Sequence, residues 1–288
     1  MGAVAWLATV GVASVWQLAT RYGVSTDLTA WDLALLRYTV PALVLSPLLW
    51  RRGLWPGGVK TGAAVGLVVG AGLPFGLMAM AGAQFAPAAH MGAVLPGAMP
   101  LMTCLLCVVV FGDRFPRAHW VALGLIVLGV AWLVGPALWQ VDGAHPAIST
   151  GHGLFLGASV LWALYTVSFR ASGINAWYAT ALIAFWSSVC VVPLWLAVGM
   201  TQLWQVAPGD LILQVFAQGL LAGVVGLAAY NLAIAHLGAA VAATSGAAVP
   251  IVTAAGGAWV LGEGLTQATL VGVLVVSLGI GWLARARA

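Results

Sequence analysis

The sequence predicts an all-α membrane protein in which ten transmembrane helices form two inverted five-helix repeats. Three observations point to this fold. Charged residues make up 6% of the 288 residues and apolar residues 63%, whereas a soluble protein has about 25% charged residues. Ten stretches are long and apolar enough to cross a bilayer, which takes about 20 residues each. The two halves of the chain also resemble each other.

The internal repeat is clearest near the end of each half. Residues 89–133 align with residues 239–283 without a gap, at a constant difference of 150 in number. The matched pairs include Pro100 with Pro250, Thr103 with Thr253, Gly112 with Gly262, Asp113 with Glu263 and, at a difference of 146, Trp16 with Trp162. We therefore expect repeats over residues 1–145 and 146–288. Because each holds an odd number of helices, the second is upside down, as in many secondary transporters.

In the first repeat the expected spans end at turn residues and charges. The first span stops before the turn at residues 23–27, the second before Arg51-Arg52-Gly53 and the fourth before Gly112-Asp113-Arg114. The five spans are expected over residues 3–22, 31–50, 61–83, 87–111 and 117–136.

The second repeat is divided in the same way. Asp142-Gly143 precedes it, Pro208-Gly209-Asp210 separates its second and third spans, and Gly262-Glu263-Gly264 separates its last two. Its spans are expected over residues 151–170, 176–198, 210–236, 239–261 and 268–284.

The basic residues predict the orientation. With both termini in the cytoplasm, only Arg21 lies outside and Arg37 lies within a span. The cytoplasmic side then holds Arg51, Arg52, Lys60, Arg114, Arg117, Arg170, Arg285 and Arg287. Because cytoplasmic loops carry an excess of Lys and Arg, we expect a multi-pass protein of a bacterial inner (plasma) membrane with both termini cytoplasmic.

Several short motifs resemble the drug/metabolite transporter superfamily, EamA type. Leu35-Leu36-Arg37-Tyr38 followed by Pro47-Leu48 resembles its second-helix motif. The others are Tyr230-Asn231-Leu232-Ala233, Gly238-Ala239-Ala240, Ala247-Ala248-Val249-Pro250-Ile251 and Leu261-Gly262-Glu263-Gly264-Leu265-Thr266. The resemblance implies ten helices and a central cavity between helices 1, 3, 4, 6, 8 and 9, with helices 5 and 10 at the periphery. Asp113-Arg114 departs from the family's acidic-then-small pair.

Arg37 is the ionisable residue that the sequence places deep in a span. It lies about eight residues into the second span, and so about 12 Å deep at a rise of 1.5 Å per residue. A charge there costs at least about 2.5–3.5 kcal/mol. Two interpretations stand: Arg37 attracts a substrate carboxylate or other anion, or it binds carbonyls at the end of a neighbouring helix and stabilises the fold.

Aromatic and polar residues at mid-depth complete the candidate substrate site, since rings with polar tips suit a planar or amphipathic solute. Packing of helix on helix is the alternative for each ring. His90 begins the fourth span and either binds at the interface or titrates near neutral pH and links transport to protons; His145 and His152 are expected in solvent. The candidate substrate-binding residues are Trp16, Gln17, Arg37, Tyr38, His90, Trp162, Tyr165, Tyr230, Asn231, Thr244 and Ser245.

Proline and glycine are expected to interrupt the third, fourth, eighth and ninth spans, since proline frees a carbonyl that lipid cannot satisfy. The candidate hinges are Gly72, Pro74, Pro96, Pro100, Gly223 and Pro250. Small residues at four-residue spacing predict close helix contacts at Gly62, Gly66 and Gly70, and at Gly153 with Gly157.

Several function classes are disfavoured. No Asp or Glu falls in the middle third of any expected span, which argues against a carrier of organic cations. There is no P-loop for ATP, and histidine and cysteine never reach metal-ligand spacing, so no metal or cofactor is expected. Cys104, Cys107 and Cys190 are interpreted as small core residues. The net charge of +4 does not indicate nucleic acid as a partner.

The sequence therefore predicts a secondary transporter of a small organic metabolite, an amino acid or related carboxylated solute, that works by alternating access. Export follows from the family resemblance. An uptake permease or an uncoupled facilitator is the alternative. An intramembrane enzyme is a further one, but Arg37 and His90 alone do not make a catalytic set. The expected partners are a small-molecule substrate and the lipid bilayer, and the chain is expected to be a monomer or a homodimer.

Overall fold

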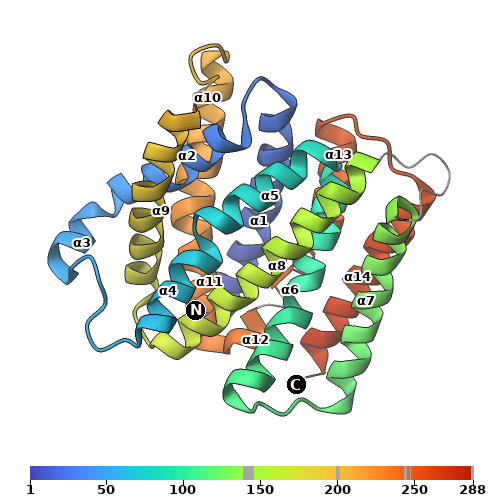
Figure 1. Ribbon diagram of the computed structural model, residues 1–288. Coiled ribbons are helices and arrows are strands. Elements are labelled where there is room, and N and C mark those ends of the chain that lie inside the picture. Colours follow the sequence, from blue (N-terminus) through green and yellow to red (C-terminus); the bar gives the residue numbers. More distant parts are fainter. Residues whose placement is uncertain (139–145, 199–201, 243–244, 247, 287–288) are drawn as a thin grey trace.

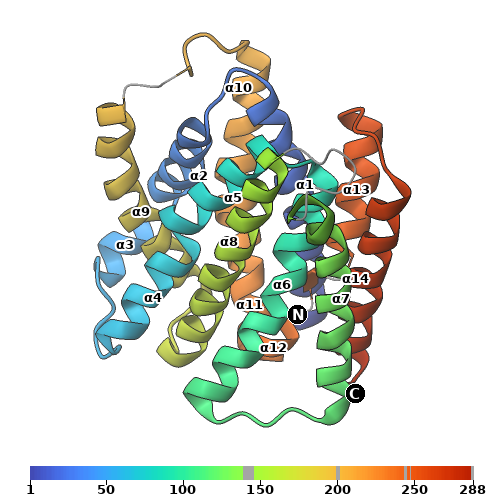
Figure 2. The same ribbon diagram turned by 45° about the vertical axis from the view of Figure 1, so that its right-hand side comes forward.

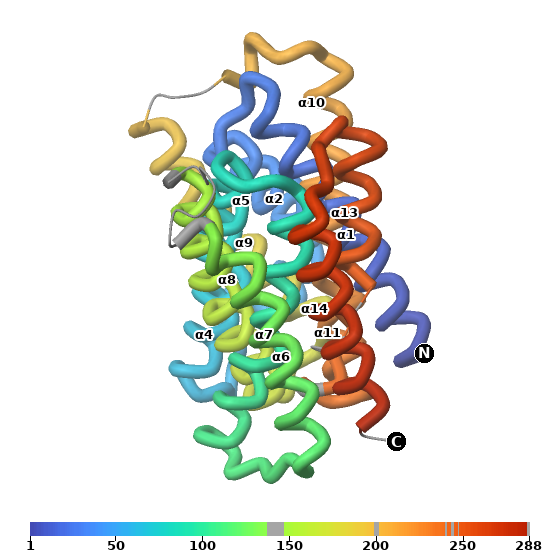
Figure 3. The backbone as a smooth tube through the Cα atoms, turned by 90° about the vertical axis from the view of Figure 1, so that its right-hand side faces the viewer, coloured from blue at the N-terminus to red at the C-terminus, as the bar shows by residue number. Residues whose placement is uncertain are grey.

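The computed structural model is a bundle of helices (Figures 1 and 2). It describes residues 1–286 except 139–145, 199–201, 243–244 and 247, and every regular element within them is a helix. The N- and C-terminal ends of the chain lie toward the same end of the bundle (Figure 3). The largest buried cluster packs α5, α6 and α8 together around Phe75, Met91 and Phe155.

Each expected span is represented by one or more helices. The first half contains α1 (Gly2–Ser25), α2 (Ala30–Val44), α3 (Ser46–Arg52), α4 (Thr61–Ala71), α5 (Leu73–Phe85), α6 (Ala88–Phe111) and α7 (Arg117–Leu138). The second half contains α8 (Pro146–Ser172), α9 (Ala176–Val198), α10 (Pro208–Gln214), the π-helical η2 (Val215–Gly226), α11 (Leu227–Leu237), α12 (Ala239–Ala242), α13 (Val249–Val260) and α14 (Gln267–Arg285).

Among the described residues, eight helical stretches are long and apolar enough to cross a membrane, or nine if the bent pair α2–α3 is one span. The expected span 239–261 corresponds to α12 and α13, and α13 alone has only 12 residues. The expected helices 5 and 10 correspond to α7 and α14, which pack against each other at one side of the bundle (Figure 2).

The second span is bent by 57° between α2 and α3. Pro47 lies in the first turn of α3 and has no N–H to donate to the carbonyl of Leu43 four residues earlier. The Ser46 hydroxyl donates to that carbonyl instead, at 2.8 Å. The carbonyl of Leu43 therefore has a donor at the bend.

The third span breaks at Gly72, between α4 and α5, as the glycines and Pro74 predicted. Side chains from two other helices bind the backbone groups that the break frees. The Tyr38 hydroxyl of α2 donates to the carbonyl of Gly72 at 2.5 Å, and the Ser187 hydroxyl of α9 accepts from the N–H of Leu73 at 3.1 Å.

The fourth span, in contrast, is not interrupted. Helix α6 runs continuously through Pro96 and Pro100, so the break expected there was wrong. Membrane helices retain prolines where side chains of neighbouring helices bind the disturbed backbone. Pro96 and Pro100 are both buried among neighbouring helices, and the Ser159 hydroxyl of α8 donates to the nearby carbonyl of Leu95 at 2.8 Å.

The eighth span changes pitch where glycines predicted an irregularity. Gly223 lies in the π-helical η2, and a Cβ there would come within 2.8 Å of the Arg37 carbonyl. Only glycine lets η2 approach α2 this closely. In the ninth span, Pro250 lies in the first turn of α13, where a proline is compatible with a helix.

The glycine contacts predicted in α4 exist at two of three positions. A Cβ on Gly70 would lie 2.4 Å from the backbone nitrogen of Tyr165 in α8, and one on Gly66 would clash with Ser168. A Cβ on Gly62 or Gly153 would meet nothing within 4 Å. The contacts expected at these two were therefore wrong, because both positions lie on exposed faces of their helices.

Two further expectations about buried positions were wrong. Cys104 and Cys107 are buried, but Cys190 is exposed on the surface of the bundle. In an apolar span an outward position is as apolar as an inward one, so hydropathy does not distinguish them. His152 was expected in solvent but is 1% exposed, because α8 begins five residues earlier than the expected span. His145 lies outside the described residues.

The two repeats end their fourth helices in the same way. Gly112 and Gly262 both have positive φ, of 69° and 66°. The N–H of Asp113 donates to the carbonyl of Cys107 at 3.3 Å, and the N–H of Glu263 donates to that of Gly257 at 3.1 Å. A glycine with left-handed backbone thus ends the fourth helix of each repeat, as is common at helix C-termini, and it places the two acidic residues at matching points of the repeats.

Candidate functional site: a cavity beside Arg37

A cavity of about 70 Å³ lies at the centre of the bundle. Its walls come from α1, α5, α6, α8, η2 and α11 and from residues at the start of α13, and α2 adds Arg37. These include the helices that the family resemblance implied. The lining residues are Thr9, Val12, Ala13, Trp16, Gln17, Arg37, Phe75, Leu95, Pro96, Met99, Trp162, Ala222, Gly226, Leu227, Tyr230, Ser245, Gly246 and Val249.

One wall of the cavity is a continuous row of aromatic rings. The ring centroids of Trp16 and Phe75 are 5.9 Å apart, those of Phe75 and Trp162 4.8 Å, and those of Trp162 and Tyr230 4.9 Å. Rings at these distances attract one another through their quadrupoles as well as by burial. The row forms an apolar surface against which a planar or branched apolar group can pack.

Arg37 supplies the charge of this cavity. Its guanidinium carbon lies 4.5 Å from the ring centroid of Trp16, a cation–π distance, and the residue is 5% exposed. Its Nε and Nη1 atoms are buried and have no hydrogen-bond partner within the described part of the chain. None of the described lining residues is acidic. A buried cation with unused donors favours an anion.

Hydrogen bonds between helices fix the polar side chains around Arg37. The Trp16 indole donates to Gln218 of η2 at 2.8 Å, and Gln218 donates to Thr20 at 3.0 Å. Gln218 is fully buried between α1 and η2. Gln17 accepts from Thr253 of α13 at 3.0 Å. The Trp16 ring beneath the guanidinium is thus held by a bond from α1 to η2.

The cavity brings together six of the eleven candidate substrate-binding residues: Trp16, Gln17, Arg37, Trp162, Tyr230 and Ser245. It also includes Pro96 of the candidate hinges. Thr244 lies outside the described residues.

The other four candidates lie elsewhere. Tyr165 donates to Asn231, whose amide donates to Thr180 and to the carbonyl of Ala176, each at 3.1 Å. These groups connect α8 and α11 to α9. Tyr38 binds the break at Gly72, and His90 stacks on His152 near the start of α6.

Several residues that line the cavity were not among the candidates predicted from the sequence. Phe75 directly follows Pro74 at the break in the third span, and this position could have indicated that its side chain lines the cavity. Thr9, Leu95 and Met99 carry no such signal, because apolar and small residues fill every face of these helices.

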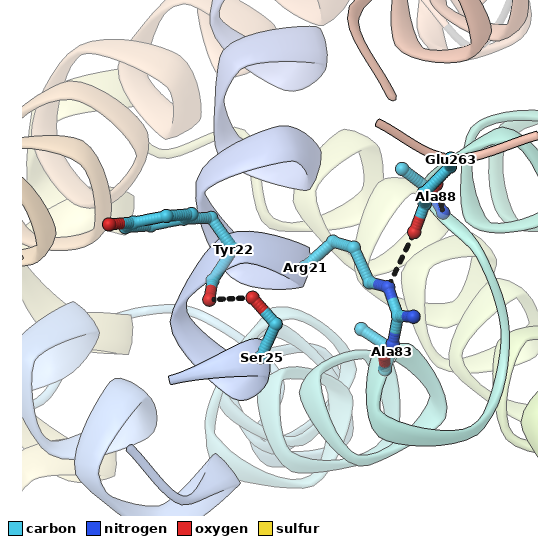
Figure 4. Close-up of polar contacts among 6 residues, drawn as sticks. All are labelled: Arg21, Tyr22, Ser25, Ala83, Ala88 and Glu263. Atoms are coloured by element: carbon cyan, nitrogen blue, oxygen red, sulfur yellow. Dashed lines mark hydrogen bonds and ion pairs between the residues drawn. The ribbon is translucent and has the colours of Figure 1, made fainter. Parts of the chain in front are cut away.

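An ion pair joins helices near the α13–α14 connection, at the end of the bundle opposite the termini (Figure 1). Figure 4 shows its contacts. The Arg21 guanidinium of α1 donates to Glu263 at 2.7 Å and to the carbonyl of Ala83 at 2.6 Å. The other oxygen of Glu263 accepts from the N–H of Ala88, in the first turn of α6, at 2.8 Å. We name this group the Arg21–Glu263 latch. It connects α1, α5, α6 and the segment between α13 and α14.

A corresponding ion pair lies at the other end. Arg170, near the end of α8, pairs with Asp113 through two bonds, one of them 3.2 Å long. We name it the Arg170–Asp113 latch. Each latch joins the end of a repeat's first helix to the acidic residue after the other repeat's fourth helix. The α6–α7 and α13–α14 connections that carry the acids lie at opposite ends of the bundle (Figure 1).

Comparison with known proteins agrees with this architecture. The model of the EamA-like transporter family matches the chain twice, over residues 1–135 and 149–285. No curated protein matches the chain in sequence. Twenty-eight chains of solved structures match it. One of them, titled "Crystal structure of protein", is 18% identical with a TM-score of 0.62, and the match covers 97% of this chain and 96% of that one. At this identity the likeness shows the fold.

Proposed function

Because the chain belongs to the EamA-like transporter family, we propose that it is a secondary carrier for a small organic carboxylate. The observation that carries the proposal is the buried guanidinium of Arg37, with two unpartnered nitrogens beside an otherwise apolar cavity. A carboxylate meets a guanidinium through two parallel hydrogen bonds. The bound solute would neutralise the charge and use the free donors.

The aromatic wall of the cavity indicates the chemical type of the solute beyond its carboxylate. Rings on Trp16, Phe75 and Trp162 favour an apolar or planar body. The α-ammonium of an amino acid can lie over a ring face such as that of Tyr230. It can also donate to the oxygens of the lining residues Thr9, Gln17 and Ser245. We therefore assign an amino acid with an apolar side chain, or a related carboxylated metabolite, as the substrate.

We further propose that the bundle is two inverted five-helix repeats, residues 1–145 and 146–288, with α12 and α13 forming one span of the ten. Both termini would be cytoplasmic in a bacterial inner membrane. The ends of α3 and α8 and the α6–α7 connection, which are rich in arginine, would then face the cytoplasm. The family resemblance favours export as the direction of transport.

Alternating access would use the two latches in turn. Opening the Arg21–Glu263 latch separates α1 and α5 from the α13–α14 connection and exposes the cavity on one side. Opening the Arg170–Asp113 latch separates α8 from the α6–α7 connection on the other side. The repeat symmetry relates the two movements, as expected for an inverted duplication.

Counterflow in liposomes tests the function. Purified protein is reconstituted with an excess of unlabelled apolar amino acid or carboxylic acid inside, and the same labelled solute is added outside without ATP. We expect labelled acid to accumulate transiently and the amide analogue to fail to compete. A folded protein that exchanges neither class, over a panel of apolar amino acids and carboxylic acids, would contradict the proposal.

A further inference from the structure

A pair of histidines, His152 buried and His90 half-buried, lies between the first turn of α6 and the start of α8, outside the cavity. The rings of His90 and His152 are stacked, with centroids 5.0 Å apart and planes inclined by 27°. The Nδ1 atom of His90 is 2.9 Å from the Nε2 atom of His152. A neutral imidazole has one donor and one acceptor nitrogen, so one ring donates to the other.

The outer nitrogens of the pair can take one more proton. Nδ1 of His152 is buried and without a hydrogen-bond partner among the described residues, and Nε2 of His90 lies 3.4 Å from the hydroxyl of Thr269 in α14. If His90 holds a proton on each nitrogen, it donates both to His152 and to Thr269. The bond between the rings is then charge-assisted. A second proton would place two cations in contact, which repel each other.

The charged groups at this end of α6 belong to the Arg21–Glu263 latch. Glu263 accepts from the N–H of Ala88, two residues before His90, and its carboxylate interacts electrostatically with the imidazole of His90. Arg21 of α1 pairs with this same carboxylate. Helices α13 and α14 bring no charged side chain to it, and neither does α5, which packs against the start of α8 through Gly82 and Ala86. Asp142 and His145, which precede α8, lie outside the described residues.

We propose that the His90–His152 pair is a proton-binding site through which the carrier couples solute transport to one proton. The inference rests on the proposed carrier function and adds the coupling ion to it. The proton comes from water on the Glu263 side of the bundle and is held between the two rings, so no other reactant takes part.

The latch provides the coupling. With the pair neutral, Glu263 pairs with Arg21 and the bundle is closed at this end. A proton on the pair places a second cation beside the same carboxylate, which then divides its interaction between Arg21 and the imidazolium. The ion pair that closes this end is weaker as a result. Loading the proton therefore favours opening of the Arg21–Glu263 latch, and releasing it favours closure.

Transport with and without a pH gradient tests the inference in liposomes. His90→Gln and His152→Gln should keep counterflow, which needs no net proton movement, but should lose the acceleration of net transport by a pH gradient. The proton flux that accompanies net transport, read by an internal pH dye, should be lost as well. His236→Gln is the matched control, because this exposed histidine lies at the end of α11, and it should behave like wild type. Two variants are used so that a folding failure of one leaves the other.

A second measurement does not depend on transport. Detergent-solubilised protein is moved from pH 8 to pH 5 in weak buffer, and proton uptake is compared between wild type and the double His→Gln variant. We expect a difference of about one proton per chain, because the pair titrates as a unit. A difference of zero or two would overturn the inference, and so would pH-gradient-driven net transport that is unchanged in folded His152→Gln. Absence of counterflow in the wild-type protein would instead refute the carrier function.

Discussion

At the scale of single residues, the chemistry of the cavity depends on Arg37. Its guanidinium is over the Trp16 ring and leaves Nε and Nη1 without partners in the part of the chain that the structure describes. An arginine that served only the fold would donate to carbonyls at a neighbouring helix end. These two nitrogens do not, so the charge is available to a ligand.

Arg37→Gln should therefore separate binding from folding. Hydrogen bonds to a charged group contribute about 1.5–3 kcal/mol, so affinity for the acid should fall about tenfold to a hundredfold. Binding of the neutral amide analogue should be unchanged. Removing a buried unpaired charge should leave the melting temperature the same or higher. Arg37→Lys should keep part of the acid affinity, because the charge persists without the two-pronged contact.

Isothermal titration with the acid and the amide, beside thermal unfolding of each variant, checks this prediction. If both Arg37 variants instead unfold at lower temperature and lose both ligands equally, Arg37 is structural.

Arg37 could be predicted from the sequence, but only some of the residues that surround it in the cavity could. Depth and charge identify Arg37 and Trp16 without a structure. Tyr165 and Asn231 have the same depth and polarity as Tyr230, yet they face α9. In a span that is apolar all round, the direction in which a side chain points is set by tertiary packing, and the sequence does not encode it as a pattern.

At the scale of elements, small residues decide how closely helices approach. Gly70 contacts the backbone of α8 near Tyr165, whereas Gly62, two turns earlier in α4, contacts nothing. The two glycines are equivalent in sequence pattern and differ in packing, so they form a matched pair for experiment.

Gly70→Ala should destabilise the protein by about 1–3 kcal/mol, the usual cost of overpacking, because the new methyl group would overlap the backbone of α8. Gly62→Ala should leave stability unchanged or raise it slightly, since alanine favours a helix more than glycine does. Thermal unfolding in detergent measures both. Equal effects of the two substitutions would show that α4 and α8 are not in contact at Gly70.

The elements themselves were more predictable than the site. Most expected span ends agree with the helices because charges and glycines mark them, although α8 begins five residues early. The break at Gly72 followed from Pro74. The continuity of α6 could not be predicted in this way, because Pro96 and Pro100 are buried among neighbouring helices. Whether a proline breaks a membrane helix depends on neighbours that a local pattern does not reveal.

At the scale of the whole molecule, the two matched repeats and the two latches support the proposed mechanism of alternating access. Glu263 and Asp113 occupy matching helix caps, and each reaches an arginine of the other repeat. The alignment of the two acids was visible in the sequence. Their arginine partners were not, because Arg21 and Arg170 are not matched at either repeat spacing.

Labelling of single cysteines tests the proposed topology on a background without Cys104, Cys107 and Cys190. A cysteine at Gly57, between α3 and α4, should react with an impermeant thiol reagent only from the cytoplasm. One at Gly209, at the start of α10, should react only from outside. A Cβ at either glycine meets nothing within 4 Å, so folding should not change. Labelling of both from the same side would contradict the ten-span arrangement.

The proposed mechanism requires that one cavity be reached from either side of the membrane in turn. Ala222 lines that cavity, so we place a single cysteine there on the same background and add impermeant reagent to one side at a time. We expect this cysteine to react with reagent added on either side, and we expect the proposed carboxylate substrate to protect it from labelling. Glu263→Gln should increase reaction from outside, and Asp113→Asn should increase reaction from the cytoplasm. A cysteine that reacts from one side only, in the parent and in both latch variants, would contradict alternating access through this cavity.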